Sequence, residues 1–244
     1  MNVVIVGGHG KVAMRLARLL VPQGDIKVVS VFRNGWQAQD VAATGALPVV
    51  LSLEDDPVEK FTATFQGKDI VYFCAGAEGK GGLECYRTVD YEGALKVFDA
   101  IELTRSPKPR LIMLSAIDVR DTNKTPAHYT EKDIQHSQQL WESMGHYLQA
   151  KFDADKNLSQ RTAFKWTMLR PGCLTSSRGT GRASVGKAPL GTTISRDDVA
   201  LTLALLADRP DADGIGIDLN GGDEKIGEAL NSFIETGESD FHVC

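Results

Sequence analysis

Three glycines stand within positions 7–10, directly after the strand-like residues 2–6 and before a segment with helical spacing. Gly7, Gly10 and Ala13 fit G-x-x-G-x-x-[G/A], a pattern whose small residues let the N–H groups of a helix N-terminus approach a pyrophosphate. The same glycines would also suit a purely structural strand–turn–helix. Because the turn belongs to the first strand–helix unit, we expect a dinucleotide cradle. Its expected contacts are Gly7, His9, Gly10, Lys11 and Val12.

The second predicted strand ends in an arginine, at the place where the adenosine ribose of a dinucleotide would lie. A carboxylate there binds the ribose 2′-OH of NAD, whereas an arginine suits the 2′-phosphate of NADP. The residues read SVFRNGW, with no carboxylate between Arg33 and Asp40. A guanidinium binds a phosphate through two N–H groups, although an exposed arginine in an Asn-Gly turn would look the same. The pattern favours NADP(H) over NAD(H).

A third candidate for cofactor contact is the end of the fourth predicted strand, which reads Cys74-Ala75-Gly76-Ala77. Small residues at such an edge let a nucleotide lie against the backbone. We therefore expect Ala75 and Gly76 to contact the cofactor, and a simple turn is the alternative.

Residues 147–151 read YLQAK and offer a group for proton transfer. On a helix, Tyr147 and Lys151 lie one turn apart on one face. The ammonium is expected to favour the phenolate and lower the pKa of Tyr147, which makes a usable acid or base. The pair alone is easily found by chance. Ser115, at the end of the predicted strand 110–116, adds a hydroxyl for a substrate oxygen, unless it only caps its own backbone.

Alternating strand-like and helix-like segments position these residues. The apolar segments are near-continuous, as in strands buried on both faces of a parallel sheet. This alternation predicts an α/β fold, a Rossmann-type doubly wound, mostly parallel sheet in a single domain, 1–244, with a small C-terminal substrate-side region. The predicted strands are 2–6, 26–32, 47–53, 69–76, 110–116, 164–172 and 214–222, and the clearest helices are 12–20, 90–103 and 197–208.

Two segments lack a strand or helix pattern of the core. Residues 118–135 are polar and partly helical in character, and residues 173–193 are rich in Gly, Ser and basic side chains. Both follow strands, at the edge where such sheets bind ligands. Long irregular segments in compact domains are often binding loops, so 173–193 is predicted to be a substrate or lid loop.

The composition excludes several classes of protein. With 244 residues, a net charge of −5 and no dense basic cluster, a nucleic-acid surface is not expected. The chain has no apolar run long enough for a membrane span and no basic leader. Four scattered cysteines and five histidines show no metal-ligand spacing, so no metal site is expected. Reduced cysteines and a cytoplasmic location are the expectation, with a small-molecule substrate as partner and the oligomeric state left open.

Together these features resemble the short-chain dehydrogenases/reductases, in particular the atypical subgroup with NmrA-like and epimerase-like members. The resemblance covers nearly the whole chain. The motifs that carry it are GGHGKV (7–12), CAGAEGKGG (74–82), VDYEGALKV (89–97), LSA (114–116), YLQAK (147–151), LRPG (169–172) and SRDDVA (195–200).

The resemblance implies a fold that binds NAD(P)(H) and a Ser-Tyr-Lys set that acts on a carbonyl or alcohol. Tyr147 would exchange the proton during hydride transfer, Lys151 would bind the nicotinamide ribose, and Ser115 would orient the substrate oxygen. The residues that would border the nicotinamide ring are Pro171, Gly172 and Cys173.

Three departures from the family pattern limit this inference. Asp90 stands where the main family commonly has an asparagine that holds a relay water. Ser115 and Tyr147 are farther apart in sequence than usual, and residue 13 is Ala rather than Gly. The leading hypothesis is an NADP(H)-dependent oxidoreductase acting on a small carbonyl compound. The alternatives are an NADP-binding redox sensor or regulatory protein without efficient turnover, and a sugar-nucleotide epimerase/dehydratase-like enzyme.

Overall fold

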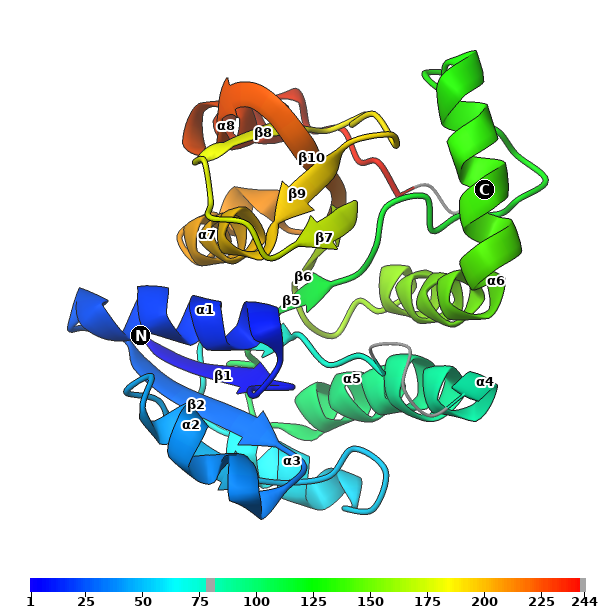
Figure 1. Ribbon diagram of the computed structural model, residues 1–244. Helices are drawn as coiled ribbons and strands as arrows, with labels where there is room; N and C mark the ends of the chain where they lie inside the picture. Colours follow the sequence, from blue (N-terminus) through cyan, green and yellow to red (C-terminus); the bar gives the residue numbers. More distant parts are fainter. Residues whose placement is uncertain (78–81, 242–244) are drawn as a thin grey trace.

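The computed structural model describes residues 1–77 and 82–241 of the chain, and its centre is an eight-stranded sheet (Figure 1). The strand order is β3-β2-β1-β4-β5-β6-β10-β8. Neighbouring strands run parallel except for the antiparallel pair β10 and β8. This arrangement confirms the predicted α/β, Rossmann-type doubly wound sheet. The strands are β1 (Asn2–Val6), β2 (Lys27–Phe32), β3 (Leu47–Val50), β4 (Ile70–Phe73), β5 (Arg110–Leu114), β6 (Trp166–Pro171), β8 (Arg182–Val185) and β10 (Ile215–Lys225).

Helices cover both faces of the sheet. α1, α7 and α8 lie over one face, and α3, α5 and the second half of α6 lie over the other (Figure 1). The helical elements are α1 (Lys11–Leu20), α2 (Ala38–Ala42), α3 (Val58–Phe65), α4 (Gly82–Cys85), a π-helical segment (Tyr86–Glu92), α5 (Gly93–Leu103), α6 (Glu131–Ser159), α7 (Arg196–Leu206) and α8 (Ile226–Thr236). Within the described residues, no helix is both long and apolar enough to cross a membrane.

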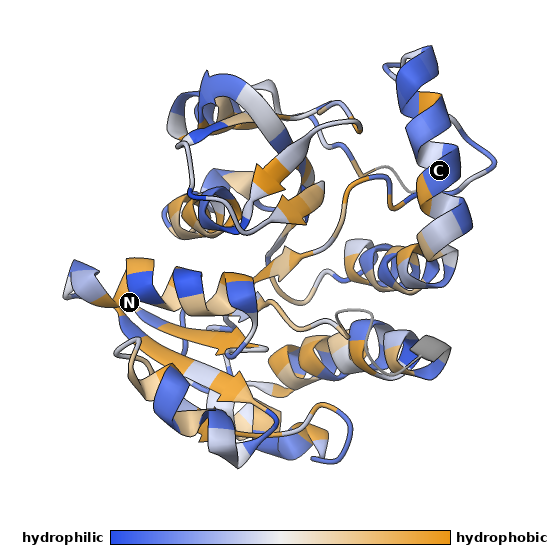
Figure 2. Cartoon of the chain, in the orientation of Figure 1, coloured by the Kyte–Doolittle hydropathy of each residue, from blue (hydrophilic) through white to orange (hydrophobic). Residues whose placement is uncertain are grey.

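The near-continuous apolar strands are explained by the two cores on either side of the sheet. Along β1, Val3 and Ile5 face the core beneath α1 and α7, whereas Val4 and Val6 face the core beneath α3 and α5. Figure 2 shows the corresponding hydrophobic colour on the strands and mixed colour on the helices. A strand covered on both faces cannot alternate apolar and polar residues, which is why this pattern was readable in the sequence.

The longest helix, α6, is broken at Met144, whose φ of −131° and ψ of 19° are not helical. Figure 1 shows its first half standing away from the body of the molecule and its second half lying beside α5. Thr130 begins the helix with a capping box, because its side chain and that of Asp133 each accept a hydrogen bond from the other residue's backbone N–H. Residues 118–130 therefore form the loop, and the predicted irregular segment 118–135 ends as helix.

Residues 173–193 contain more regular structure than their sequence predicts. The chain forms β7 (Cys173–Thr175), β8 and β9 (Thr193–Ser195), and β7 pairs with β9 in a separate two-stranded sheet. The prediction of an irregular segment was therefore incomplete. Strands of three or four residues, separated by Gly and Ser, are too short to show a recognisable period.

Candidate active site

The turn between β1 and α1 packs closely against its neighbours, and it can do so only because its glycines lack side chains. Gly7 has a φ of +80°, and a Cβ at this residue would lie 2.6 Å from the backbone N and Cα of Ala75. A Cβ at Gly8 would lie 2.6 Å from the Cβ of Ser30. The turn is closed by a hydrogen bond of 2.8 Å from the Gly10 N–H to the Gly7 carbonyl. Gly8 is thus a further required glycine that the fingerprint does not include.

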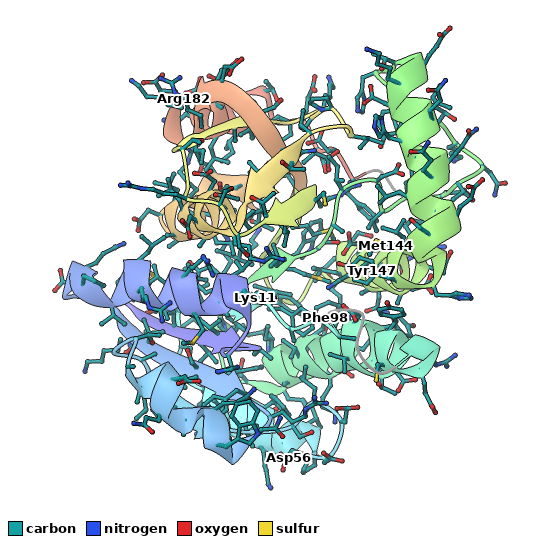
Figure 3. All side chains as sticks on the ribbon, viewed as in Figure 1. Lys11, Asp56, Phe98, Met144, Tyr147 and Arg182 are labelled. Atoms are coloured by element: carbon teal, nitrogen blue, oxygen red, sulfur yellow. The ribbon has the colours of Figure 1, made fainter. Side chains whose placement is uncertain are left out.

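The N-terminus of α1 fits an anionic group. Gly10 is its N-cap, no side chain caps it, and its first turn contains no acidic residue. The first N–H groups of a helix have no partner within the helix and carry partial positive charge, so a pyrophosphate suits this place. The Lys11 side chain is exposed at the first turn (Figure 3), whereas the Val12 side chain is buried in the core. Val12 therefore offers only its backbone N–H.

His9 is held by residues from the segment that follows β2. Its Nε2 lies 3.0 Å from an oxygen of Asp40, its Nδ1 lies 3.0 Å from Nε2 of Gln37, and its ring meets that of Trp36 edge-on at 5.7 Å. Trp36 is 73% exposed. No pattern in the sequence indicates that these three residues reach the glycine turn, because their contacts depend on how the loop folds.

Arg33 lies at the predicted place but is paired with a carboxylate. Its Nη1 donates a hydrogen bond of 2.7 Å to Glu54, and its side chain is 59% exposed. Glu54 follows β3 and was not singled out in the sequence. An exposed pair of this kind contributes little to stability, so Arg33 can exchange Glu54 for another anion at small cost.

The loop after β4 is attached to the helix that follows it by Asp90. This fully buried residue lies in the π-helical segment, and its Oδ2 accepts a hydrogen bond of 3.1 Å from the Ala77 N–H. A Cβ at Gly76 would lie 3.2 Å from the Oδ1 of Asp90. π-helical turns are frequent at functional sites. Residues 78–81 of the motif CAGAEGKGG lie outside the described residues.

Lys151 forms a buried ion pair with the same aspartate. Its Nζ lies 3.1 Å from the Oδ1 of Asp90, and both side chains are almost completely buried. Burial lowers the pKa of Lys151, but Asp90, Tyr147 and Asp155 together outweigh burial, and the net pKa is raised. Lys151 is therefore a cation held in place by Asp90.

Tyr147, labelled in Figure 3, lies on α6. Lys151 is one helical turn farther along, and its ammonium is 5.9 Å from the centre of the Tyr147 ring. The predicted lowering of its pKa is wrong for this structure. Burial raises the pKa of the phenol, the Lys151 charge lowers it, and the charges of Asp90 and Asp155 raise it again, so the net direction is upward. Among the residues that the structure describes, none is hydrogen-bonded to the Tyr147 hydroxyl, whose ring packs edge-on against Tyr86 at 5.6 Å.

Ser115 is buried at the end of β5 and has a partner that the sequence did not suggest. Its Oγ donates a hydrogen bond of 2.7 Å to Oδ2 of Asp155, and its N–H donates to the Leu169 carbonyl. Burial raises the pKa of Asp155 to about 6 against opposing contributions from Arg170, Ser115 and Lys151. Asp155 is one turn beyond Lys151, so Tyr147, Lys151 and Asp155 share one face of α6.

The end of β6 is shaped by an asparagine from β10. A Cβ at Gly172 would lie 2.4 Å from the side chain of Asn220, and the Gly172 N–H donates to the Leu219 carbonyl. Pro171 is buried and Cys173 is exposed. The position of Gly172 therefore requires glycine for a packing reason, whether or not a nicotinamide ring lies beside it.

The loop beyond Cys173 borders a cavity of about 170 Å³. Asp198 accepts hydrogen bonds from the N–H groups of Thr180 and Gly181 and from the hydroxyl of Ser195, the N-cap of α7. Asp198 therefore fixes the loop to the start of this helix. Arg182 lines this cavity and lies well away from Tyr147 in Figure 3. The cavity is thus separate from the Tyr147 region.

Comparison with known proteins identifies the family. A family model described as NAD(P)H-binding matches residues 7–210. The chain belongs to this NAD(P)H-binding family. The match begins at the glycine turn and includes Arg33, Asp90, Ser115, Tyr147 and Lys151.

Relatives extend the likeness over nearly the whole chain. The UPF0659 protein C216.03 of Schizosaccharomyces pombe is 38% identical over 98% of this chain and 97% of its own. A structure described as an NAD-dependent epimerase/dehydratase from Bacillus halodurans is 31% identical, with a TM-score of 0.80 over 95% of this chain and 99% of its own. The oxidoreductase ylbE from Lactococcus lactis is 25% identical, with a TM-score of 0.80 over 100% of both chains. The resemblance to atypical short-chain dehydrogenases/reductases is confirmed.

In this member of the NAD(P)H-binding family, a continuous series of contacts joins the glycine turn to the YLQAK helix. Gly7 lies against Ala75, the Ala77 N–H binds Asp90, and Asp90 binds Lys151 beside Tyr147. Ser115 is placed at the same helix face, but its hydroxyl hydrogen is directed to Asp155. Asp155 and Glu54 are the carboxylates that sequence reasoning missed, and the i+4 spacing from Lys151 was the available signal for Asp155.

Proposed function

We propose that the protein is an NADP(H)-dependent oxidoreductase that transfers hydride to or from a small carbonyl or alcohol. The carrying observation is the series of contacts from Gly7 through Ala75 and Asp90 to Lys151 and Tyr147. It couples the place suited to a pyrophosphate with the place suited to proton transfer. Both the oxidoreductase and the epimerase/dehydratase named among the similar structures are compatible with such a site.

Different residues would bind different parts of the cofactor. The N–H groups of His9, Lys11 and Val12 would bind the pyrophosphate, since those of Gly8 and Gly10 already donate to backbone carbonyls. Ala75 and Gly76 would lie beside the adenosine ribose, and Lys151 would face the nicotinamide ribose. Pro171, Gly172 and Cys173 would border the nicotinamide ring. When bound, NADPH supplies a hydride to the carbonyl carbon.

The raised pKa of Tyr147 supports reduction as the favoured direction at neutral pH. A phenol that keeps its proton can donate it to the carbonyl oxygen as hydride reaches the carbon. Lys151 holds positive charge near the phenolate that remains, and Asp90 holds Lys151 in place. Oxidation of an alcohol would require the phenolate, so its rate is expected to increase with rising pH.

Preference for NADP(H) over NAD(H) rests on Arg33. In the proposed complex its guanidinium leaves Glu54 and binds the 2′-phosphate, with the exposed Lys11 as a further positive group. Glu54 opposes this preference by its charge.

The free cysteines Cys74, Cys85 and Cys173 support a reducing, cytoplasmic location.

The direct test is a panel of small aldehydes and ketones incubated with NADPH, with loss of the nicotinamide absorbance as the readout. At least one compound should be turned over by the wild-type protein. Tyr147→Phe should lower kcat by about 10²–10⁴-fold because the general acid is lost, while NADPH binding by calorimetry stays unchanged. Equal turnover by both proteins would overturn the role of Tyr147.

The epimerase/dehydratase-like alternative is favoured by the Bacillus halodurans structure. In that reaction the same residues would bind a cofactor that is regenerated in each cycle. A substrate converted with no net consumption of NADPH would support this alternative. Tight NADPH binding without conversion of any substrate would support the other alternative, an NADP-binding redox sensor or regulatory protein.

A further inference from the structure

Ser115 has a single hydrogen to donate, and the structure shows where that hydrogen is directed. The distance of 2.7 Å between Ser115 Oγ and Asp155 Oδ2 is typical of a strong bond to a carboxylate. A hydroxyl has one donor and two acceptor lone pairs. With its hydrogen given to Asp155, Ser115 can only accept a hydrogen bond from any further group.

The surroundings of Asp155 leave Ser115 as its hydrogen-bonding partner. The residue is completely buried, and its other oxygen, Oδ1, has no partner among the residues that the structure describes. Arg170, in β6, is close enough to act on it by charge, but the Arg170 N–H groups are used by carbonyls of Ala116, Val119 and Asp240 and by Asp218. Removing the Ser115 hydroxyl would therefore leave the carboxylate with no donor.

The same surroundings decide the charge of Asp155. The cations that face it are Lys151 on its own helix and Arg170 on β6, and both favour the carboxylate. The acidic groups that interact with Asp155 by charge are Asp218 on β10 and the phenol of Tyr147. Burial raises the pKa of Asp155 to about 6, so the side chain is mainly ionised at neutral pH and accepts rather than donates.

We propose that Asp155 is a positioning residue that makes Ser115 a hydrogen-bond acceptor, so that the substrate carries a hydroxyl or another donor beside the carbonyl that accepts hydride. This inference rests on the proposed function and narrows its substrate class to hydroxycarbonyl compounds. Hydride goes from the nicotinamide to the carbonyl carbon, and the Tyr147 proton goes to the carbonyl oxygen. The substrate's neighbouring hydroxyl donates to Ser115, with no bond broken there.

The substrate consequence is tested with acetoin and butan-2-one, which differ by one hydroxyl next to the ketone. The wild-type protein at neutral pH should show a higher kcat/KM for acetoin. Asp155→Ala removes the bond that fixes the orientation of the Ser115 hydroxyl, which can then turn and donate to the carbonyl oxygen of either ketone instead of accepting from the acetoin hydroxyl. The acetoin to butan-2-one ratio should therefore fall by about tenfold, the value of one hydrogen bond to substrate. Asp153→Ala, on the partly exposed face of the same helix, is the matched control and should keep the ratio. An unchanged ratio in Asp155→Ala would overturn the substrate inference.

A second measurement needs no turnover. The titration of Asp155 is followed by NMR of carboxyl-labelled aspartate, with Asp155→Asn to assign the signal. Ser115→Ala removes the donor that stabilises the carboxylate, so the pKa of Asp155 should rise further. An unchanged pKa would overturn the proposed hydrogen bond. Failure of both ketones to react in wild-type protein, with NADPH bound, would instead count against the proposed function.

Discussion

The glycine turn and the YLQAK helix face are built in opposite ways. At the turn, Gly7 lies against the backbone of Ala75 and Gly8 lies against Ser30, so neither position has room for a side chain. At the helix face, Lys151 is held by an ion pair with the buried carboxylate of Asp90, which lies far from it in the sequence. The first region tolerates no added atoms, and the second tolerates no lost charge. Substitutions should therefore fail for different reasons in the two regions.

The largest effect is expected for Asp90→Ala. The substitution leaves Lys151 buried without its partner, so Lys151 must lose its proton or remain an unpaired charge. The free energy of unfolding should fall by about 3–5 kcal/mol, measured by urea denaturation. Asp99→Ala breaks a pair with Arg161 in which the aspartate is 54% exposed, and it should cost less than about 1 kcal/mol. Equal losses in the two variants would contradict the account of the buried pair.

Asp155 should make stability depend on pH. Its pKa is raised from 3.8 to about 6 in the folded protein, so the folded state holds this proton more tightly than the unfolded chain. Stability is therefore lost as pH rises through about 4 to 6. Between pH 4 and pH 7 the wild-type protein should lose about 2–3 kcal/mol of unfolding free energy relative to Asp155→Asn. A difference between the two proteins that does not change with pH would rule out the buried, titrating carboxylate.

The glycine turn is probed by comparing two glycines that both have positive φ. Gly7 (φ +80°) would place a Cβ 2.6 Å from Ala75, whereas Gly24 (φ +73°) has no atom within 4 Å of that position. Backbone strain affects both alanine variants, but only Gly7→Ala adds a clash with backbone. It should lose about 2 kcal/mol more than Gly24→Ala. It should also weaken NADPH binding by calorimetry, which Gly24→Ala should leave intact.

The smallest effect is expected at the exposed pair of Arg33 and Glu54. Arg33→Ala should weaken NADPH binding by about tenfold, the equivalent of about 1.4 kcal/mol, and leave NADH binding unchanged. Glu54→Gln removes a competing charge and should strengthen NADPH binding. Equal loss of both cofactors in Arg33→Ala would show that the arginine does not read the 2′-phosphate.

The sequence predicted the framework well because a doubly wound sheet leaves local signals. Strands buried on both faces, such as β1 and β4, are continuously apolar, and the Gly7–Ala13 spacing marks the first turn. For the YLQAK helix face, the sequence predicted which residues are present but not which residues they contact. Tyr147 and Lys151 were identifiable on one helix, whereas the Asp90–Lys151 and Ser115–Asp155 contacts join residues 61 and 40 positions apart.

That difference explains the one prediction that was reversed. The expected lowering of the Tyr147 pKa considered Lys151 alone, whereas burial and two aspartates act on the same phenol. Charges brought together by tertiary structure leave no periodic signal. The short strands β7, β8 and β9 escaped prediction for a similar reason, since each depends on a partner strand rather than on its own pattern.

The most direct test of the central claim follows the hydride itself. NADPH with both hydrogens at C4 of the nicotinamide replaced by deuterium is incubated with the protein and a reactive ketone from the panel, and the alcohol product is analysed by mass spectrometry. The account predicts one deuterium on the carbon that bears the new hydroxyl, with Tyr147→Phe forming almost no product. Product without deuterium, or bound NADPH that transfers nothing to any ketone, would contradict it.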